Sequence, residues 1–98
     1  MDKNIKLDST PALDSTLSER GKRYGSFVGH AAITQSLKDI MRNHWGWSKL
    51  SPSQKEALEM TAHKIGRILN GNPDYADSWH DIAGYASLID KELNGEIK

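Results

Sequence analysis

Apolar residues along the chain recur at spacings of three, four and seven, which is the period of amphipathic helices, and strict alternation over five or more residues does not occur. The pattern predicts helices over about 26–44, 52–70 and 73–94. Each has one apolar stripe that we expect to face a shared core. The stripes comprise Phe27, Ile33, Leu37, Ile40 and Met41, then Leu58, Ala62, Ile65 and Leu69, then Trp79, Ile82, Ala83, Ala86, Ile89 and Leu93.

The clearest helix boundaries lie between Ser51 and Gly95. Ser51-Pro-Ser-Gln54 has the composition of a capping box with proline at the first helical position. Asn70-Gly71 provides a stop, at which we expect the glycine to adopt a left-handed conformation. Asn72-Pro-Asp74 is expected to begin the next helix. The fold class predicted is all-α, a small helical bundle built on this αα-hairpin and completed by oligomerisation.

Two segments precede the first long helix. Residues 1–18 are polar and keep no helical period for long, so we expect a flexible N-terminal tail before a single helical domain over 19–98. A short helix from about Pro11 to Arg20 is the alternative. Ser18–Phe27 is predicted to be a loop in which two glycines flank a cluster of Arg and Lys. Such a loop suits a phosphate or carboxylate, and an ordinary solvated basic loop is the alternative.

Trp45-Gly46-Trp47 is predicted to connect the first two long helices. We expect both tryptophans to pack and seal the end of the bundle, with their ring N–H groups reaching water or backbone. Exposed rings would instead mark a partner surface or a base-stacking site.

Composition excludes several classes of protein. The 98 residues suffice for one domain, and a chain this short has a small core, so association of copies is expected. Thirteen basic and thirteen acidic residues cancel, which argues against general nucleic-acid binding. There is no cysteine for disulfides or thiolate metal sites, no apolar run long enough for a membrane and no apolar signal-peptide segment. We expect a cytoplasmic protein.

Four carboxylates form two pairs on neighbouring helices, Glu56 with Glu59 and Asp77 with Asp81. Each pair shares a helical face, and an antiparallel hairpin can bring the faces together. Oxygen ligands suit Mg²⁺ or Mn²⁺, which can bridge phosphates and activate water. The alternative is that these acids complement helix dipoles or form salt bridges. The candidates for contacts to a nucleotide or its phosphates are Arg20, Arg23, Tyr24, His63, Lys64, Arg67 and Tyr85.

The Glu56-x-x-Glu59 motif followed by an acidic pair on the next helix resembles the all-α nucleoside triphosphate pyrophosphohydrolases, the MazG-like and dimeric dUTPase-like enzymes. The second motif of that superfamily is usually ExxD; Asp81 matches its aspartate, and Ser78 stands where its glutamate belongs. In these families two chains contribute helices to a shared site, so the resemblance implies a homo-oligomer. It also implies Glu59 and Asp81 as catalytic residues among the four metal ligands.

A second resemblance covers Arg20 to Leu88. The segment HKIGRILNGNPDYADSWHDIAGYASL and the upstream RGKRYGSF resemble small uncharacterised domains of bacteriophage genomes. It implies a phage-encoded protein acting in the host cytoplasm.

The first expectation for the function is a metal-dependent nucleotide pyrophosphohydrolase. The alternative, favoured by Ser78 and the small size, is a non-catalytic accessory protein that sequesters a nucleotide-derived signal or binds a host defence protein. A purely structural oligomerising bundle is a third interpretation.

Overall fold

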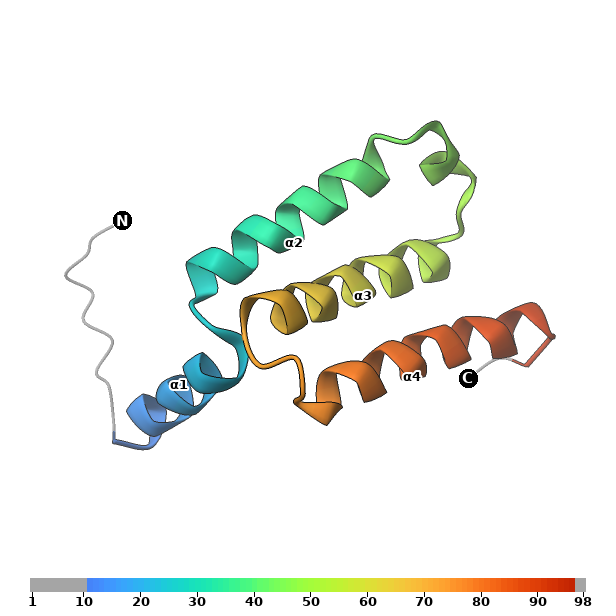
Figure 1. The fold of residues 1–98 in the computed structure, drawn as a ribbon. Coiled ribbons are helices and arrows are strands. Elements are labelled where there is room, and N and C mark those ends of the chain that lie inside the picture. Colours follow the sequence, from blue (N-terminus) through green and yellow to red (C-terminus); the bar gives the residue numbers. More distant parts are fainter. Residues whose placement is uncertain (1–10, 97–98) are drawn as a thin grey trace.

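A computed structural model describes residues 11–96, which form four α-helices and one short 3₁₀-helix (Figure 1). The chain between 11 and 96 contains no strand, so the predicted all-α fold is confirmed. None of the described helices combines the length and apolar character needed to cross a bilayer. The elements are α1 (Pro11–Tyr24), α2 (Phe27–Arg42), η1 (Trp45–Lys49), α3 (Pro52–Asn70) and α4 (Ala76–Leu93).

The long helices α2, α3 and α4 lie side by side, with successive helices antiparallel (Figure 1). Helix α3 is in the middle and packs against α2 on one side and α4 on the other. Helix α1 extends from the end of this layer, where it contacts α2 and α3. The described chain is thus a single layer of three helices with a fourth at one end.

The start of the chain differs from the predicted tail and loop. Residues 1–10 of the expected tail lie outside the described residues. Residues 11–18 belong to α1, which begins at Pro11 as in the alternative interpretation. The helix continues to Tyr24, so the predicted loop over 18–27 shrinks to Gly25 and Ser26. Ser26 caps α2, because its Oγ accepts a hydrogen bond from the Gly29 N–H at 3.1 Å.

The predicted capping box of α3 is confirmed. Ser51 Oγ accepts from the Gln54 N–H at 3.1 Å, and Gln54 Oε1 accepts from the Ser51 N–H at 2.9 Å. Pro52 occupies the first turn, where its missing N–H costs nothing.

The turn between α3 and α4 corrects two predictions. Helix α4 begins at Ala76 rather than at 73, because Asn72 Oδ1 accepts from the Asp74 N–H at 3.0 Å and makes a side-chain turn there. Gly71 has a φ of −135° and is therefore not left-handed. Glycine is required there for another reason: a Cβ would collide with the backbone of Arg23 and Tyr24 at the end of α1.

The single chain buries very few apolar side chains. Among the described residues, only Ala62 of the apolar stripes is fully buried, at 3% exposure. The prediction that Leu58 and Leu69 are buried is wrong for the isolated chain, since they are 43% and 66% exposed. Ile65 is half-buried. The reason is geometric, because a one-layer arrangement gives each helix neighbours at its sides but leaves its two faces uncovered.

Other stripe residues behave in the same way. Half-buried members are Ile33, Leu37, Met41, Ile82 and Ile89, and exposed members are Phe27, Ile40, Trp79, Ala83, Ala86 and Leu93. The expectation that both connecting tryptophans are packed is met in part. Trp47 is half-buried, whereas Trp45 is 74% exposed, with the Lys49 Nζ 4.5 Å from its ring centre.

Candidate functional site

A pocket of about 490 Å³ lies where the end of α1, the start of α2 and the last turns of α3 meet. Its lining includes four of the seven side chains predicted to contact a nucleotide or phosphate, namely Arg20, Tyr24, His63 and Arg67. Residues more than forty positions apart in the sequence are therefore brought together here. The remaining lining residues are Leu17, Gly21, Gly25, Ser26, Phe27 and His30.

The α1 end of the pocket is held by the α3–α4 turn. Asn70 Nδ2 donates to the carbonyl oxygens of Tyr24, at 2.7 Å, and Ser26, at 2.8 Å. The Asn72 N–H donates to the Arg23 carbonyl oxygen at 2.6 Å. Gly25 has a φ of +77°, which lets the chain leave α1 while passing close to Asn70. One asparagine therefore fixes both the end of α1 and the start of α2.

Tyr24 and Arg67 contact each other directly. The guanidinium carbon of Arg67 lies 4.0 Å from the centre of the Tyr24 ring, which is a cation–π contact. The Tyr24 ring in turn meets Tyr75 edge to face, with 6.1 Å between ring centres. This stack orients the Arg67 side chain within the pocket lining, so less conformational entropy is lost when it binds an anion.

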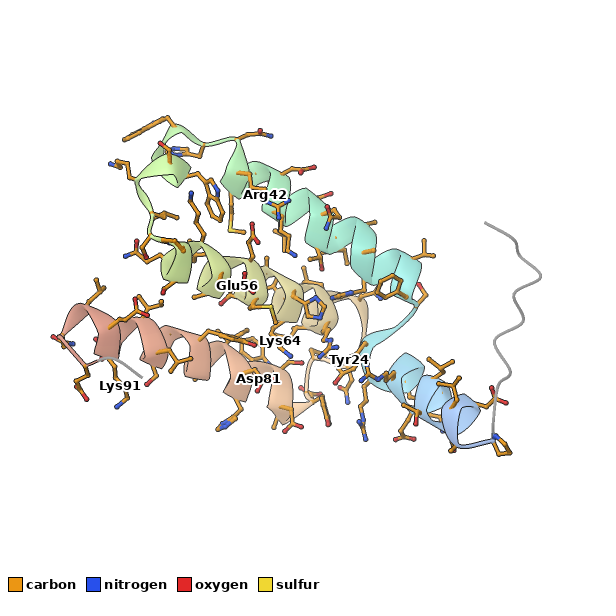
Figure 2. All side chains as sticks on the ribbon, turned by 180° about the vertical axis from the view of Figure 1, so that it is seen from behind. Tyr24, Arg42, Glu56, Lys64, Asp81 and Lys91 are labelled. Carbon is orange, nitrogen blue, oxygen red and sulfur yellow. The ribbon has the colours of Figure 1, made fainter. Side chains whose placement is uncertain are left out.

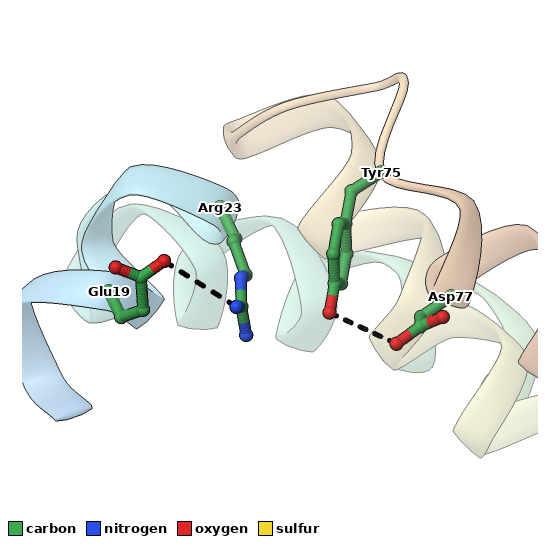
Figure 3. Close-up of polar contacts among 4 residues, drawn as sticks. All are labelled: Glu19, Arg23, Tyr75 and Asp77. Carbon is green, nitrogen blue, oxygen red and sulfur yellow. Dashed lines mark hydrogen bonds and ion pairs between the residues drawn. The ribbon is translucent and has the colours of Figure 1, made fainter.

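Arg23 was also predicted to contact phosphate, but its side chain makes its contacts outside the pocket. Its guanidinium carbon lies 4.9 Å from the centre of the Tyr75 ring, and its Nη2 pairs with Glu19 at 3.5 Å (Figure 3). The Tyr75 hydroxyl donates to Asp77 at 3.0 Å in the same view. These contacts fasten α1 to the start of α4 and place Arg23 outside the pocket lining.

The pocket carries positive charge that the described chain does not neutralise. Within residues 11–96, ion pairs occupy Arg23, Arg42 and Lys64, but neither Arg20 nor Arg67 has a carboxylate within 4 Å. None of the lining residues is acidic. Arg20 and Arg67, which have no carboxylate partner among the described residues, therefore line the same pocket.

His63 adds a neutral polar group to this surface. Burial, reinforced by the nearby charge of Arg67, lowers the pKa of His63 to about 4, so the ring is uncharged at neutral pH. Its ring centre is 4.5 Å from that of His30, which is buried at 6% exposure. His30 Nε2 donates to the His63 carbonyl oxygen at 2.9 Å and lies 3.2 Å from Thr34 Oγ1. An anion in the pocket would favour the charged form of His63 and raise its pKa.

The four carboxylates predicted to bind a metal do not converge in the chain. Glu59 faces α2 and pairs with Arg42 at 2.8 Å, whereas Asp81 pairs with Lys64 at 2.9 Å on the α4 side of α3. The two positively charged partners lower the pKa of both carboxyl groups through these hydrogen bonds. Asp77 accepts from Tyr75 near the start of α4.

Glu56 completes the predicted metal set and lies apart from the others. It lines a shallow hollow between α3 and α4 with Tyr85 and Leu88. Figure 2 shows Glu56 nearer the start of α3 than Lys64, which points to Asp81. No group of three or more His, Asp or Glu side chains within 11–96 could hold a metal ion. Within one chain, the four carboxylates are therefore not gathered around a common point in the part that the structure describes.

Lys64, Tyr85 and Ser78 also take positions other than those expected. Lys64 is buried at 8% exposure against α4, where it cannot reach the pocket lining, and Tyr85 is on the same side of α3. Ser78, which occupies the position of the second-motif glutamate, is buried at 3% exposure. A small residue is therefore compatible with the close packing of α4 at this point.

Sequence reasoning missed three contributors to the site. Phe27 is 79% exposed at the pocket edge although its spacing placed it in a core stripe. Asn70 was interpreted only as part of a helix stop, and His30 was not among the predicted contacts. The available signal was Gly25-Ser26 directly before Phe27, which marks a sharp chain reversal capped by serine.

The chain belongs to a protein family described as a domain of unknown function (DUF6378), whose family model matches residues 10–93. Comparison with curated proteins found no match, and comparison with solved structures found none either.

Proposed function

We propose that this protein binds a nucleotide, or a nucleotide-derived anion with a flat ring, in the pocket between α1, α2 and α3, and that it acts by binding rather than by turnover. This corresponds to the accessory interpretation, in which the protein sequesters a nucleotide-derived signal. The observation that carries the proposal is the pair of arginines, Arg20 and Arg67, that have no carboxylate partner in the described chain and line a pocket without acids.

The chemistry of the lining supports this class of ligand. Arginine presents a planar fork of donors that matches phosphate oxygens, and two such groups suit a doubly charged phosphate or a short phosphate chain. Phe27, which is 79% exposed beside them, offers a face on which a base could stack. Neutral His63 supplies a hydrogen-bonding group without a further desolvated charge.

The positions of the acids favour binding over hydrolysis. A metal-dependent pyrophosphohydrolase needs several carboxylates around a cation close to the phosphate chain. Here Glu59 and Asp81 each pair with a basic residue of the same chain, on opposite sides of α3. Neither lines the pocket that contains the arginines.

The test is calorimetric titration of the full chain with nucleoside mono-, di- and triphosphates, each with and without magnesium. We expect at least one nucleotide to bind without metal and without product formation. Arg67→Gln should weaken binding at least tenfold, because it removes a charged donor from the pocket. Arg42→Gln is the matched control, since Arg42 is paired with Glu59 outside the pocket and its loss should leave affinity within twofold.

Two results would contradict the proposal. Equal affinity of the Arg67→Gln and Arg42→Gln variants for the nucleotide would show that the nucleotide binds outside this pocket. Magnesium-dependent release of pyrophosphate that is lost in Glu59→Gln and Asp81→Asn would favour the hydrolase interpretation instead. As a direct readout, the His63 ring should titrate at a higher pH in the presence of the nucleotide than in its absence, measured by NMR.

A further inference from the structure

The two faces of the three-helix layer differ in chemistry. On α3, Leu58, Ile65 and Leu69 recur at spacings of seven and four and share one side of the helix. His63 and Arg67 are each two positions from Ile65, which on an α-helix places them about 200° away, on the opposite side. The pocket and the ion pair of Arg42 with Glu59 therefore belong to the polar face, and the leucines belong to what we call the apolar face.

The apolar face is hollowed on both sides of Leu58. One hollow, of about 460 Å³, lies between α3 and α4 and is lined by Ala57, Ile82 and Ile89 among others. The second, of about 390 Å³, lies between α2, η1 and α3 and is lined by Ile40, Met41 and Trp47 among others. Leu50 and Leu58 line both hollows, so the two are neighbours that meet at these side chains.

The exposure of this face leaves the protomer without a closed core. Ile40 is 71% exposed, Leu58 43% and Leu69 66%. Ala62 is the single fully buried apolar side chain of the described stripes, so every large apolar side chain in them keeps some contact with solvent. The pattern is that of a domain core divided between two bodies, which is characteristic of obligate interfaces.

We infer that a second copy of this chain covers the apolar face, so that two three-helix layers pack face to face and form a shared core. The layer has the area that such an interface needs. Helix α3 has 19 residues and is therefore about 28 Å long, and three helices about 10 Å apart give a face of roughly 800 Å². That is about what each partner buries in a stable protein interface.

Other observations favour a second copy over other occupants. The single chain has no closed core, so whatever covers the apolar face must be present whenever the protein folds. A second copy of the chain meets this condition, because copies are made together. The formal net charge of zero removes repulsion between copies. Residues 1–10 of the same chain contain only Met1, Ile5 and Leu7 as large apolar residues, which is too few to cover the face. The nucleotide pocket opens on the other face and stays accessible in such a dimer.

The test uses the full chain and begins with its mass by sedimentation equilibrium and its melting temperature over a hundredfold range of concentration. We expect a dimer, and a melting temperature that rises with concentration because association is coupled to folding. Leu58→Glu should yield monomer or unfolded chain. Val28→Glu is the matched control: Val28 is 81% exposed, lines neither hollow and should leave the dimer intact.

A second pair of variants keeps the test informative if Leu58→Glu does not fold. The chain has no cysteine, so Leu58→Cys and Val28→Cys each introduce one thiol. We expect the thiol at position 58 to react with an alkylating reagent at least tenfold more slowly than the one at 28. A monomer at every concentration, or equal reactivity of the two thiols, would overturn the inference. A dimer that Val28→Glu dissociates and Leu58→Glu does not would overturn it as well.

Discussion

Helix α3 is packed against α2 and against α4 in two different ways. Toward α2 the contact is close, because Gly66 brings the α3 backbone against Thr34 and His30. Toward α4 the buried group is the ammonium of Lys64, which Asp81 neutralises. The contact at Gly66 depends on shape and the contact at Lys64 depends on charge, so the two should respond to different perturbations.

The largest effect is expected from Gly66→Ala. Alanine is the better helix former by about 1 kcal/mol, but its Cβ would collide with Thr34 Oγ1 and the His30 ring, both fixed by their own contacts. Overpacking should therefore dominate and lower the free energy of unfolding by about 1–3 kcal/mol, measured with urea. Gly84→Ala on α4 is the control, because a Cβ there meets nothing within 4 Å. It should stabilise the protein by about 0.5–1 kcal/mol. Equal effects of the two substitutions would show that the α2 side is not close-packed.

The next largest effect is a dependence of stability on pH, which comes from His63 on the side of α3 that faces α2. Burial lowers the pKa of His63 to about 4 in the folded chain, whereas the unfolded chain titrates near 6.5. Between these values the unfolded state binds more protons, so stability should fall as the pH drops from about 6.5 to about 4. Allowing for partial solvent screening, the loss should be on the order of 2 kcal/mol. Urea unfolding across this range should give a flatter profile for His63→Gln, and an unchanged profile would contradict the assignment.

The α4 side should respond to charge, with a smaller effect because the Asp81 side chain is 41% exposed and solvent screens part of the interaction. The pKa of Asp81 is lowered by its hydrogen bond to Lys64, so Asp81→Asn should leave a buried ammonium without its partner and lower the melting temperature. Lys64→Met should restore stability in the double variant, since an apolar side chain of similar length needs no partner. Failure of that rescue would mean that Asp81 stabilises α4 in some other way.

The smallest effect is expected at the ion pair of Arg42 and Glu59, which lies on the polar face. Glu59→Gln removes one charge of a partly exposed pair in which the Arg42 side chain is 42% exposed, and ion pairs that solvent screens contribute little. Its melting temperature should therefore fall less than that of Asp81→Asn. A larger fall would indicate that Glu59 has a role beyond this pair.

Helix identity was predictable where the sequence signal is local. The capping box at Ser51 and the period of α3 depend on residues within a few positions of one another, and both are confirmed. The start of α4 was not predicted correctly, because the side-chain turn of Asn72 competes with helix formation at Pro73. The prediction of a left-handed Gly71 was wrong because the conformation of this glycine depends on its contact with α1, which is distant in sequence.

Burial and site assembly were harder to predict, since both depend on which helices become neighbours. Periodicity identifies an apolar stripe but not whether anything covers it, and Leu58 and Leu69 are exposed in the single chain for that reason. Four of the residues predicted to contact phosphate share a pocket, whereas Glu59 and Asp81 pair with basic residues of two different helices, Arg42 and Lys64.

The hydrogen bonds of Asn70 also have a kinetic consequence. They join residues 46 and 44 positions apart, whereas the α2–α3 and α3–α4 pairs are hairpins of consecutive helices. Closing a long loop costs more chain entropy than closing a hairpin, and proteins rich in local contacts fold quickly. The three-helix layer should therefore form first during refolding and α1 should dock last. Since Arg20 and Tyr24 reach the pocket only on docking, the ability to bind ligand should appear in a later kinetic phase than helix formation.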